Sequence, residues 1–102
     1  MEKDEDFEAR VRAQIVEAAQ VGFAAQYAAK YQEPSRRWRD LEASRREALI
    51  KAAELVRTSY LTGKLSPRTH DEAFAACNRH LVLGVTHVFV GAVIGYYKDC
   101  GL

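Results

Sequence analysis

The chain has 102 residues, with 15 basic and 14 acidic side chains and a formal net charge of +1. This length predicts one domain, residues 1–102, that folds without disulfides or other staples. The near-neutral charge excludes a global field that would select nucleic acid or an anionic membrane. Cys77 and Cys100 make no disulfide framework, and the opening MEKDEDFEAR is acidic where a secretory signal is basic and then apolar. We therefore expect a cytoplasmic protein with free thiols.

The first segment predicts a helix over residues 6–32. Apolar side chains recur there at steps of three and four and form one stripe. The stripe comprises Phe7, Val11, Ile15, Ala18, Ala19, Phe23, Tyr27 and Tyr31. Further alanines indicate close approach by a neighbouring helix. Gly22 costs about 1 kcal/mol relative to alanine in mid-helix, so it marks either a close contact or a mild kink.

A second helix is predicted over residues 40–62. Asp40 is the preferred N-cap, and Ser44 with Glu47 offers a capping box one turn later. Gly63 is expected to end the helix. With the Asp40 start, the apolar residues that share one face are Leu41, Leu49, Ala52, Ala53, Val56 and Tyr60.

A third helix is predicted over residues 68–98, started by Ser66–Pro67 or by Thr69. Its second half, Leu81–Tyr97, reads LVLGVTHVFVGAVIGYY and contains no charged side chain. The many β-branched residues also fit a strand or hairpin. However, this segment has no tight two-residue turn signal, and the chain has no second good strand to pair with it. We therefore predict an all-α fold of three principal helices.

A helix that is apolar nearly all round is surrounded by its own domain, by a partner chain or by lipid. One side of the C-terminal helix carries a stripe of small residues and histidine: Gly84, His87, Gly91 and Gly95. This glycine–histidine stripe permits close backbone approach, either by the alanine-rich first helix or by the same helix of a second chain. We expect the C-terminal helix to be central and a homodimer to bury the stripe.

Insertion of Leu81–Tyr97 into a membrane is an alternative. The spacing of Gly91 and Gly95 is typical of close helix pairs, and Tyr96–Lys98 resembles an interfacial anchor. Against this, the run falls short of the ~20 residues that span a bilayer, and His87 would lie near its centre. The first two helices also carry apolar stripes that need a central partner. Membrane insertion is therefore the less favoured alternative.

A basic cluster beside a tryptophan is the candidate macromolecule-binding site. It comprises Arg36, Arg37, Trp38, Arg39, Arg45 and Arg46. The five arginines, against Asp40 and Glu42, give a local charge of +3. Arginine and tryptophan are enriched at protein-interface hot spots, and phosphates and stacked bases use the same side chains. The arginines also fit a solvated helix start that pairs with nearby carboxylates.

Catalytic and metal chemistry find little support. Cys77, His80 and His87 share a helical face, but the two histidines are two turns apart, about 10 Å along the axis. Without a sharp break in the helix, that separation prevents them from sharing one zinc ion. No phosphate-binding loop, paired-carboxylate motif or nucleophile elbow is present in the sequence. We expect no enzyme activity, no metal and no cofactor.

The pattern Trp38-x2-Leu41-x4-Arg46, followed by Ala52–Ala53, resembles small uncharacterised helical proteins encoded by bacteriophages and other mobile elements. An acidic run often follows the leucine in those proteins, whereas this chain has Ala43-Ser44-Arg45 there. The resemblance implies a mobile-element origin and carries no catalytic residues.

We therefore expect a small non-enzymatic binding protein that occupies a surface of a larger macromolecule, with a protein as its partner. The resemblance implies an inhibitor of a host defence system. Two alternatives remain open: a nucleic-acid-binding module that uses the Arg36–Arg46 cluster, and a small membrane protein that inserts Leu81–Tyr97.

Overall fold

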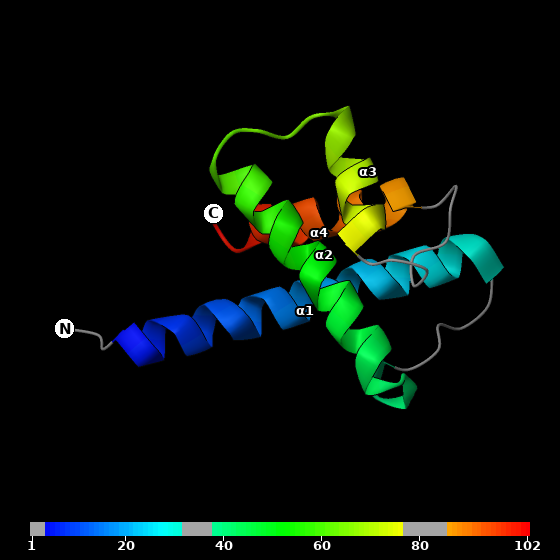
Figure 1. Ribbon diagram of the computed structural model, residues 1–102, viewed down its shortest axis with the longest axis horizontal. Coiled ribbons are helices and arrows are strands. Elements are labelled where there is room, and N and C mark those ends of the chain that lie inside the picture. The colour runs from blue at the N-terminus through cyan, green and yellow to red at the C-terminus, as the bar shows by residue number, and fades with distance from the viewer. Residues whose placement is uncertain (1–3, 32–37, 77–85) are drawn as a thin grey trace.

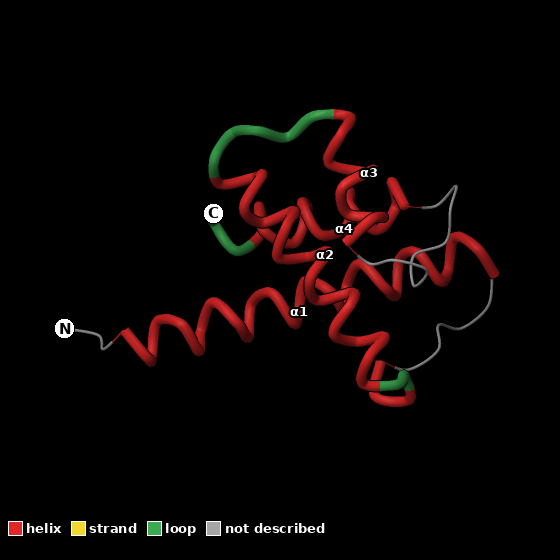
Figure 2. The backbone as a smooth tube through the Cα atoms, in the orientation of Figure 1, coloured by secondary structure: helices red, strands yellow, loops and turns green. Residues whose placement is uncertain are grey.

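The structure is a computed structural model that describes residues 4–31, 38–76 and 86–102. These residues form the α-helices α1 (Asp4–Tyr31), α2 (Ala43–Leu61), α3 (Pro67–Ala76) and α4 (Thr86–Asp99), together with the short 3-10 helix η1 (Trp38–Asp40). In Figure 1 the long helix α1 runs along the molecule and α2 crosses it. Figure 2 shows helices and loops and no strand in the described part of the chain, which confirms the all-α prediction.

The prediction of three principal helices is wrong, because the segment 68–98 contains two helices, α3 and α4. Residues 77–85 lie outside the described residues. One straight helix over 68–98 would be about 46 Å long, and only part of it could lie against α2. As separate helices, α3 and α4 both contact α2 and also contact each other. This arrangement buries Ala73 of α3 and Val93 of α4 in the same core.

The core lies where α1, α2 and α4 meet. Each of these helices contributes large apolar side chains that are almost completely buried. The main ones are Ile15, Phe23, Leu49, Val56, Phe89 and Val93. α4 contacts α1, α2 and α3, and α2 likewise contacts the three other helices.

Gly22 lies at the contact between α1 and α4. A Cβ atom added to Gly22 would lie 2.7 Å from two ring carbons of Phe89 and 2.8 Å from Cγ2 of Val93. A glycine is required at such a distance because any side chain would overlap the ring. Of the two interpretations offered for Gly22, the close contact is therefore confirmed.

α2 begins later than predicted. Asp40 lies in η1, and Glu42 has the extended backbone of the N-cap without a side-chain capping hydrogen bond. The backbone N–H of Leu41 donates to the Trp38 carbonyl at 3.1 Å, so Asp40 belongs to a separate turn before α2 starts. The Asp40 cap is therefore wrong, and so is the capping box at Ser44, which lies inside α2.

The predicted ends at Gly63 and Ser66–Pro67 are confirmed. Gly63 follows α2 with a φ of 69°, a left-handed conformation that favours glycine. α3 begins at Pro67, and the Ser66 hydroxyl accepts a hydrogen bond from the Arg68 N–H at 3.2 Å. The Ser66 N–H in turn donates to Thr69 Oγ1 at 3.1 Å. Ser66 and the first turn of α3 therefore form reciprocal capping hydrogen bonds.

Three tyrosine hydroxyls hold the C-terminal part of the chain in place. The buried Tyr97 donates to the Ala53 carbonyl of α2 at 2.7 Å. Its neighbour Tyr96 donates to a Glu17 carboxylate oxygen of α1 at 2.8 Å, and Tyr60 of α2 donates to the Leu102 carbonyl at 2.7 Å. Burial raises the pKa of Tyr97 above its ordinary value, because the phenolate would be poorly solvated there.

Candidate binding surface

The first part of α1 leaves the helix bundle. Residues 4–10 are all exposed, whereas Ile15 is 5% exposed. In Figure 1 this part of α1 extends past the other helices. The sequence explains why this part of α1 is exposed. Phe7 has acidic neighbours on both sides, and the next large apolar residue on the same face is Val11, one turn later. Phe7 is consequently 55% exposed, although the predicted stripe includes it.

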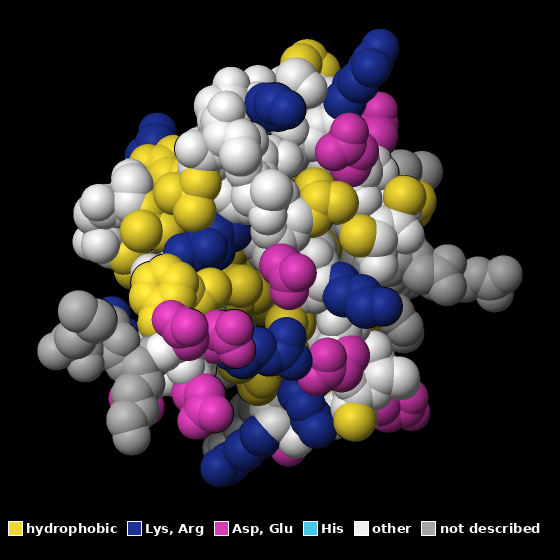
Figure 3. Space-filling model, turned by 60° about the vertical axis from the view of Figure 1, so that its left-hand side comes forward, with side chains coloured by type: hydrophobic (Ala, Val, Ile, Leu, Met, Phe, Trp, Pro, Cys, Tyr) yellow, Lys and Arg dark blue, Asp and Glu magenta, His cyan; other side chains and the backbone are white. Residues whose placement is uncertain are grey.

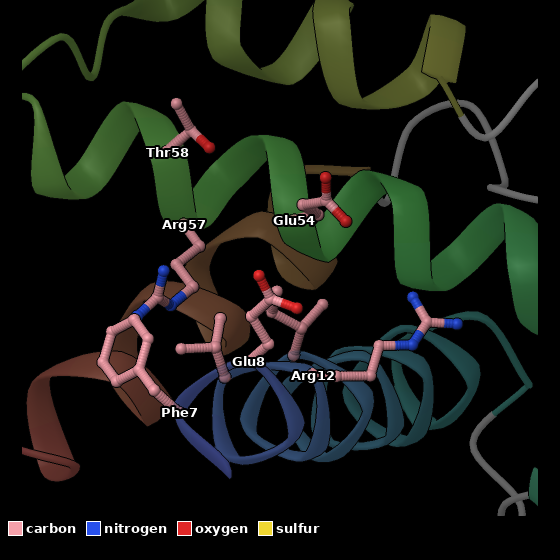
Figure 4. Close-up of a pocket in the computed structure, with 8 residues that line it drawn as sticks. Phe7, Glu8, Arg12, Glu54, Arg57 and Thr58 are labelled. Atoms are coloured by element: carbon pink, nitrogen blue, oxygen red, sulfur yellow. The ribbon is translucent and has the colours of Figure 1, made fainter. Parts of the chain in front are cut away.

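A groove separates this part of α1 from α2, and we call it the Phe7 groove. Its volume is about 550 Å³. The lining residues are Phe7, Glu8, Val11, Arg12 and Ile15 of α1 with Glu54, Arg57 and Thr58 of α2. Figure 4 shows the Arg57 side chain extending from α2 toward the ring of Phe7. A second hollow of about 330 Å³ shares Phe7 and Arg57 and reaches Leu102.

Charged side chains surround the apolar part of the groove. Arg57 Nε donates to Gln14 Oε1 at 3.0 Å, and Arg12 forms an exposed ion pair with Glu47 at 3.1 Å. Figure 3 shows hydrophobic side chains on one face of the molecule, with basic and acidic side chains beside them. An apolar centre with a charged rim is the usual composition of a protein-binding surface. The lining residues include no cysteine or histidine.

The predicted basic cluster is not a single exposed patch. Arg36 and Arg37 lie outside the described residues. The guanidinium of Arg45 lies 5.8 Å from the ring centroid of Phe23, and Trp38 packs edge-on against the same ring at 6.1 Å. These two side chains therefore help to cover the core.

Arg46 has a structural role at the start of α2. Its guanidinium donates to the Leu41 carbonyl and also to the Arg39 carbonyl at 3.4 Å. These bonds join the start of α2 to η1. Arg39 itself is exposed, so the described members of the cluster are divided between internal contacts and solvent.

The glycine–histidine stripe of α4 does not face α1. His87 and Gly91 are exposed and Gly95 is half-buried, while Gly84 lies outside the described residues. A Cβ atom added to Gly91 or Gly95 would meet nothing within 4 Å. The contact with α1 is instead made by Phe89 and other residues of the opposite side. Of the two alternatives for the stripe, packing by α1 is therefore not found in the described residues, and burial in a homodimer stays a prediction.

Two further alternatives concern metals and membranes. Within residues 4–31, 38–76 and 86–102, no group of three or more His, Cys, Asp or Glu side chains is placed to hold a metal ion. Cys77 and His80, which the sequence placed on the His87 face, lie outside these ranges. No helix of the described residues is long and apolar enough to cross a membrane.

No protein-family model, curated protein sequence or solved structure matches this chain. The fold and the surface define a small all-α protein with an open groove, lined by apolar and charged side chains, beside the start of α1. The resemblance of Trp38–Ala53 to phage-encoded proteins stays a prediction.

Sequence reasoning missed the Phe7 groove because periodicity assigned Phe7 to the core stripe. A signal was present, since acidic residues occupy positions 4, 5, 6 and 8 around Phe7. An apolar side chain in such a segment lacks neighbours with which to form a core.

Proposed function

We propose that this protein is a small non-enzymatic binding protein that occupies a surface of a larger protein through the Phe7 groove. The exposure of Phe7 supports this proposal most directly, since this large aromatic residue is 55% exposed beside a groove that also contains Val11 and Ile15. Burying such a side chain contributes roughly 1.5–3 kcal/mol. Aromatic and arginine side chains are also the residues that most often dominate interface energetics.

The finer proposal is that the larger protein belongs to a host defence system and that the chain inhibits it. The Trp38–Ala53 pattern and the small size of the chain support it. A non-enzymatic inhibitor needs only to cover a functional surface of its target. The protruding start of α1 and the adjoining groove could together present such a covering surface.

Site-specific photo-cross-linking tests the binding proposal. A photoreactive phenylalanine analogue at position 7 is expected to form an adduct with one larger protein in cells that contain the target. The same analogue at the exposed Ala75 of α3 is the matched control and is expected to form no such adduct. Phe7→Asp, introduced in an untagged competitor chain, is expected to abolish competition for the adduct. Equal adducts from positions 7 and 75, or none from either, would contradict the proposal.

A further inference from the structure

We propose that the part of the larger protein that enters the Phe7 groove is an α-helix with one apolar face and with lysine or arginine along the edge of that face. This inference rests on the proposed function, which makes the groove a binding surface, and it adds the chemistry of the partner. The apolar side chains of the partner helix pack on Phe7, Val11 and Ile15, which line the groove. Its cations pair with Glu8 and Glu54, which line the groove from opposite walls.

The walls of the groove favour a helix over an extended segment. Both walls are helices, α1 and α2, and beyond the first turn their backbone N–H and C=O groups are paired within each helix. An extended segment would find no backbone partners there, and its own polar groups would be left unpaired against the apolar side chains. A helix pairs its backbone internally. Phe7, Val11 and Ile15 follow one another at about 6 Å along the axis, so successive turns of a bound helix meet successive apolar residues.

Two carboxylates lie on opposite walls of the groove. Figure 4 shows Glu8 of α1 and Glu54 of α2 between Arg57 at one end and Arg12 at the other. Both glutamates are exposed, and in the described part of the chain neither forms an ion pair. The helix dipole does not account for them, because Glu8 lies beyond the first turn of α1 and Glu54 lies in the middle of α2. Both carboxylates are therefore open to cations of a partner.

The two arginines of the groove restrict where such cations bind. Arg12 forms an ion pair with Glu47 at 3.1 Å, so its charge is largely balanced. Arg57 donates from Nε to Gln14, which leaves its charge unbalanced, and its side chain extends toward the ring of Phe7. A partner cation is repelled at that end of the groove. We therefore place the cations of the partner between the two arginines, beside the two glutamates.

The walls of the groove as a whole are also net negative. Residues 4–12 of α1 and 47–58 of α2 form these walls and include six acidic and four basic side chains. The acidic ones are Asp4, Glu5, Asp6, Glu8, Glu47 and Glu54, and the basic ones are Arg10, Arg12, Lys51 and Arg57. The whole chain, in contrast, has a formal charge of +1. This local field attracts a basic partner and repels an acidic one.

Fluorescence anisotropy with labelled synthetic peptides and the full chain tests the proposal. The probe is a helical peptide with leucine on one face and lysine along its edge, and a second peptide has glutamate in place of lysine. We expect the dissociation constant of the lysine peptide to be about tenfold lower, and the difference to shrink as salt is raised. A lysine peptide interrupted by two prolines cannot stay helical, and it should bind about tenfold more weakly than the uninterrupted peptide.

Charge variants of the chain locate the binding. The double variant Glu8→Gln with Glu54→Gln should raise the dissociation constant of the lysine peptide by roughly tenfold, because it removes two exposed ion pairs, each contributing a factor of up to about five. Asp71→Asn with Glu72→Gln changes the net charge equally on α3 and is the matched control, which should leave the constant unchanged. All four carboxylates are exposed, so both double variants should keep the helical circular-dichroism spectrum of the parent chain.

Four outcomes would overturn the proposal. They are no binding of the lysine peptide, equal binding of the lysine and glutamate peptides, equal binding of the helical and proline-interrupted peptides, and equal losses in the two double variants.

The position-7 adduct separates this inference from the proposed function. Suppose that the adduct with a larger protein forms and that the Glu8→Gln, Glu54→Gln chain, as untagged competitor, suppresses it as well as the parent does. That result overturns the inference and leaves the function standing. Binding of the lysine peptide that this double variant loses, without any adduct in cells, supports the preference of the groove for a basic helix and contradicts the function.

Discussion

Gly22 of α1 faces the ring of Phe89 of α4 at a distance that leaves no room for a methyl group. A Cβ atom at position 22 would lie 2.7 Å from both Cδ2 and Cε2 of the ring. Phe89 is fully buried, so its ring has no solvent-filled space into which to turn. The spacing of α1 and α4 therefore depends on the missing side chain.

Gly22→Ala carries a steric cost of about 1–3 kcal/mol, because overpacking displaces the Phe89 ring or the helix. A gain of about 1 kcal/mol in helix propensity opposes this cost, so we expect the free energy of unfolding to fall by a net of about 0–2 kcal/mol. Urea denaturation measures the difference. A variant more stable than the parent by the full propensity gain of about 1 kcal/mol would show that α1 and α4 lie further apart.

Gly91→Ala is the matched substitution at an open position. A Cβ atom there meets nothing within 4 Å, so the variant gains helix propensity without overlap. We expect it to raise the free energy of unfolding by about 0.5–1 kcal/mol in the same assay. A loss of stability in dilute monomer would instead show that Gly91 is packed within the chain.

Arg46→Ala is expected to lower the free energy of unfolding by about 1 kcal/mol, because the Leu41 carbonyl loses its charged donor. Arg39→Ala removes an exposed side chain and should change it by less than about 0.5 kcal/mol. Thermal melts of the two variants side by side provide the measurement. Equal losses would contradict the division of the basic cluster into structural and exposed members.

The nucleic-acid alternative predicts a salt dependence. Each phosphate contact that is lost should reduce the slope of log affinity against log salt by roughly one. We expect the triple variant with alanine at Arg36, Arg37 and Arg39 to leave any oligonucleotide binding and its salt slope unchanged. Fluorescence anisotropy with labelled single- and double-stranded oligonucleotides is the assay. A shallower slope in the triple variant would favour the nucleic-acid function instead.

The burial of Tyr97 leads us to expect a lower free energy of unfolding at alkaline pH. Its pKa is raised by burial above the ordinary value of 10.0, so the unfolded chain releases this proton at lower pH than the folded chain. The stabilising contribution is complete below about pH 10 and declines as the pH rises further. Urea midpoints measured from pH 7 to pH 11 should therefore fall at the alkaline end.

Tyr97→Phe should cost about 1 kcal/mol at neutral pH, through loss of the bond to the Ala53 carbonyl, and should flatten the alkaline decline. It should not abolish the decline, because burial and the bond to Glu17 also raise the pKa of Tyr96. Parallel pH profiles of the parent and the variant would show that Tyr97 does not cause the decline.

The helices with clear periodicity and clear end signals could be predicted from the sequence. α1 and α2 lie within three residues of their predicted bounds, and Gly63 and Pro67 mark ends because glycine and proline act locally. The division into α3 and α4 was not predictable from periodicity, since both halves have helical patterns. It depends on both halves contacting α2, which is a tertiary effect.

The candidate site was harder to predict for a related reason. Spacing assigned Phe7 and Ile15 to one stripe, but it does not tell where a long helix leaves the body of the protein. Composition likewise grouped Arg39 with Arg46. In the structure, however, Arg39 is exposed to solvent, whereas Arg46 donates a hydrogen bond to the Leu41 carbonyl. Both errors concern which side of a helix finds a neighbour, and that is decided by the rest of the chain.

The contact between Gly22 and Phe89 also has a consequence for the order of folding. α1 makes its most extensive contact with α4, and the two helices stand near opposite ends of the sequence. A ribosome therefore releases α1 long before its main packing partner exists. During that interval the face of α1 around Gly22 lacks the cover that Phe89 and Val93 of α4 provide. Non-local contacts of this kind slow folding, so the nascent chain is most exposed to aggregation and proteolysis until α4 has emerged.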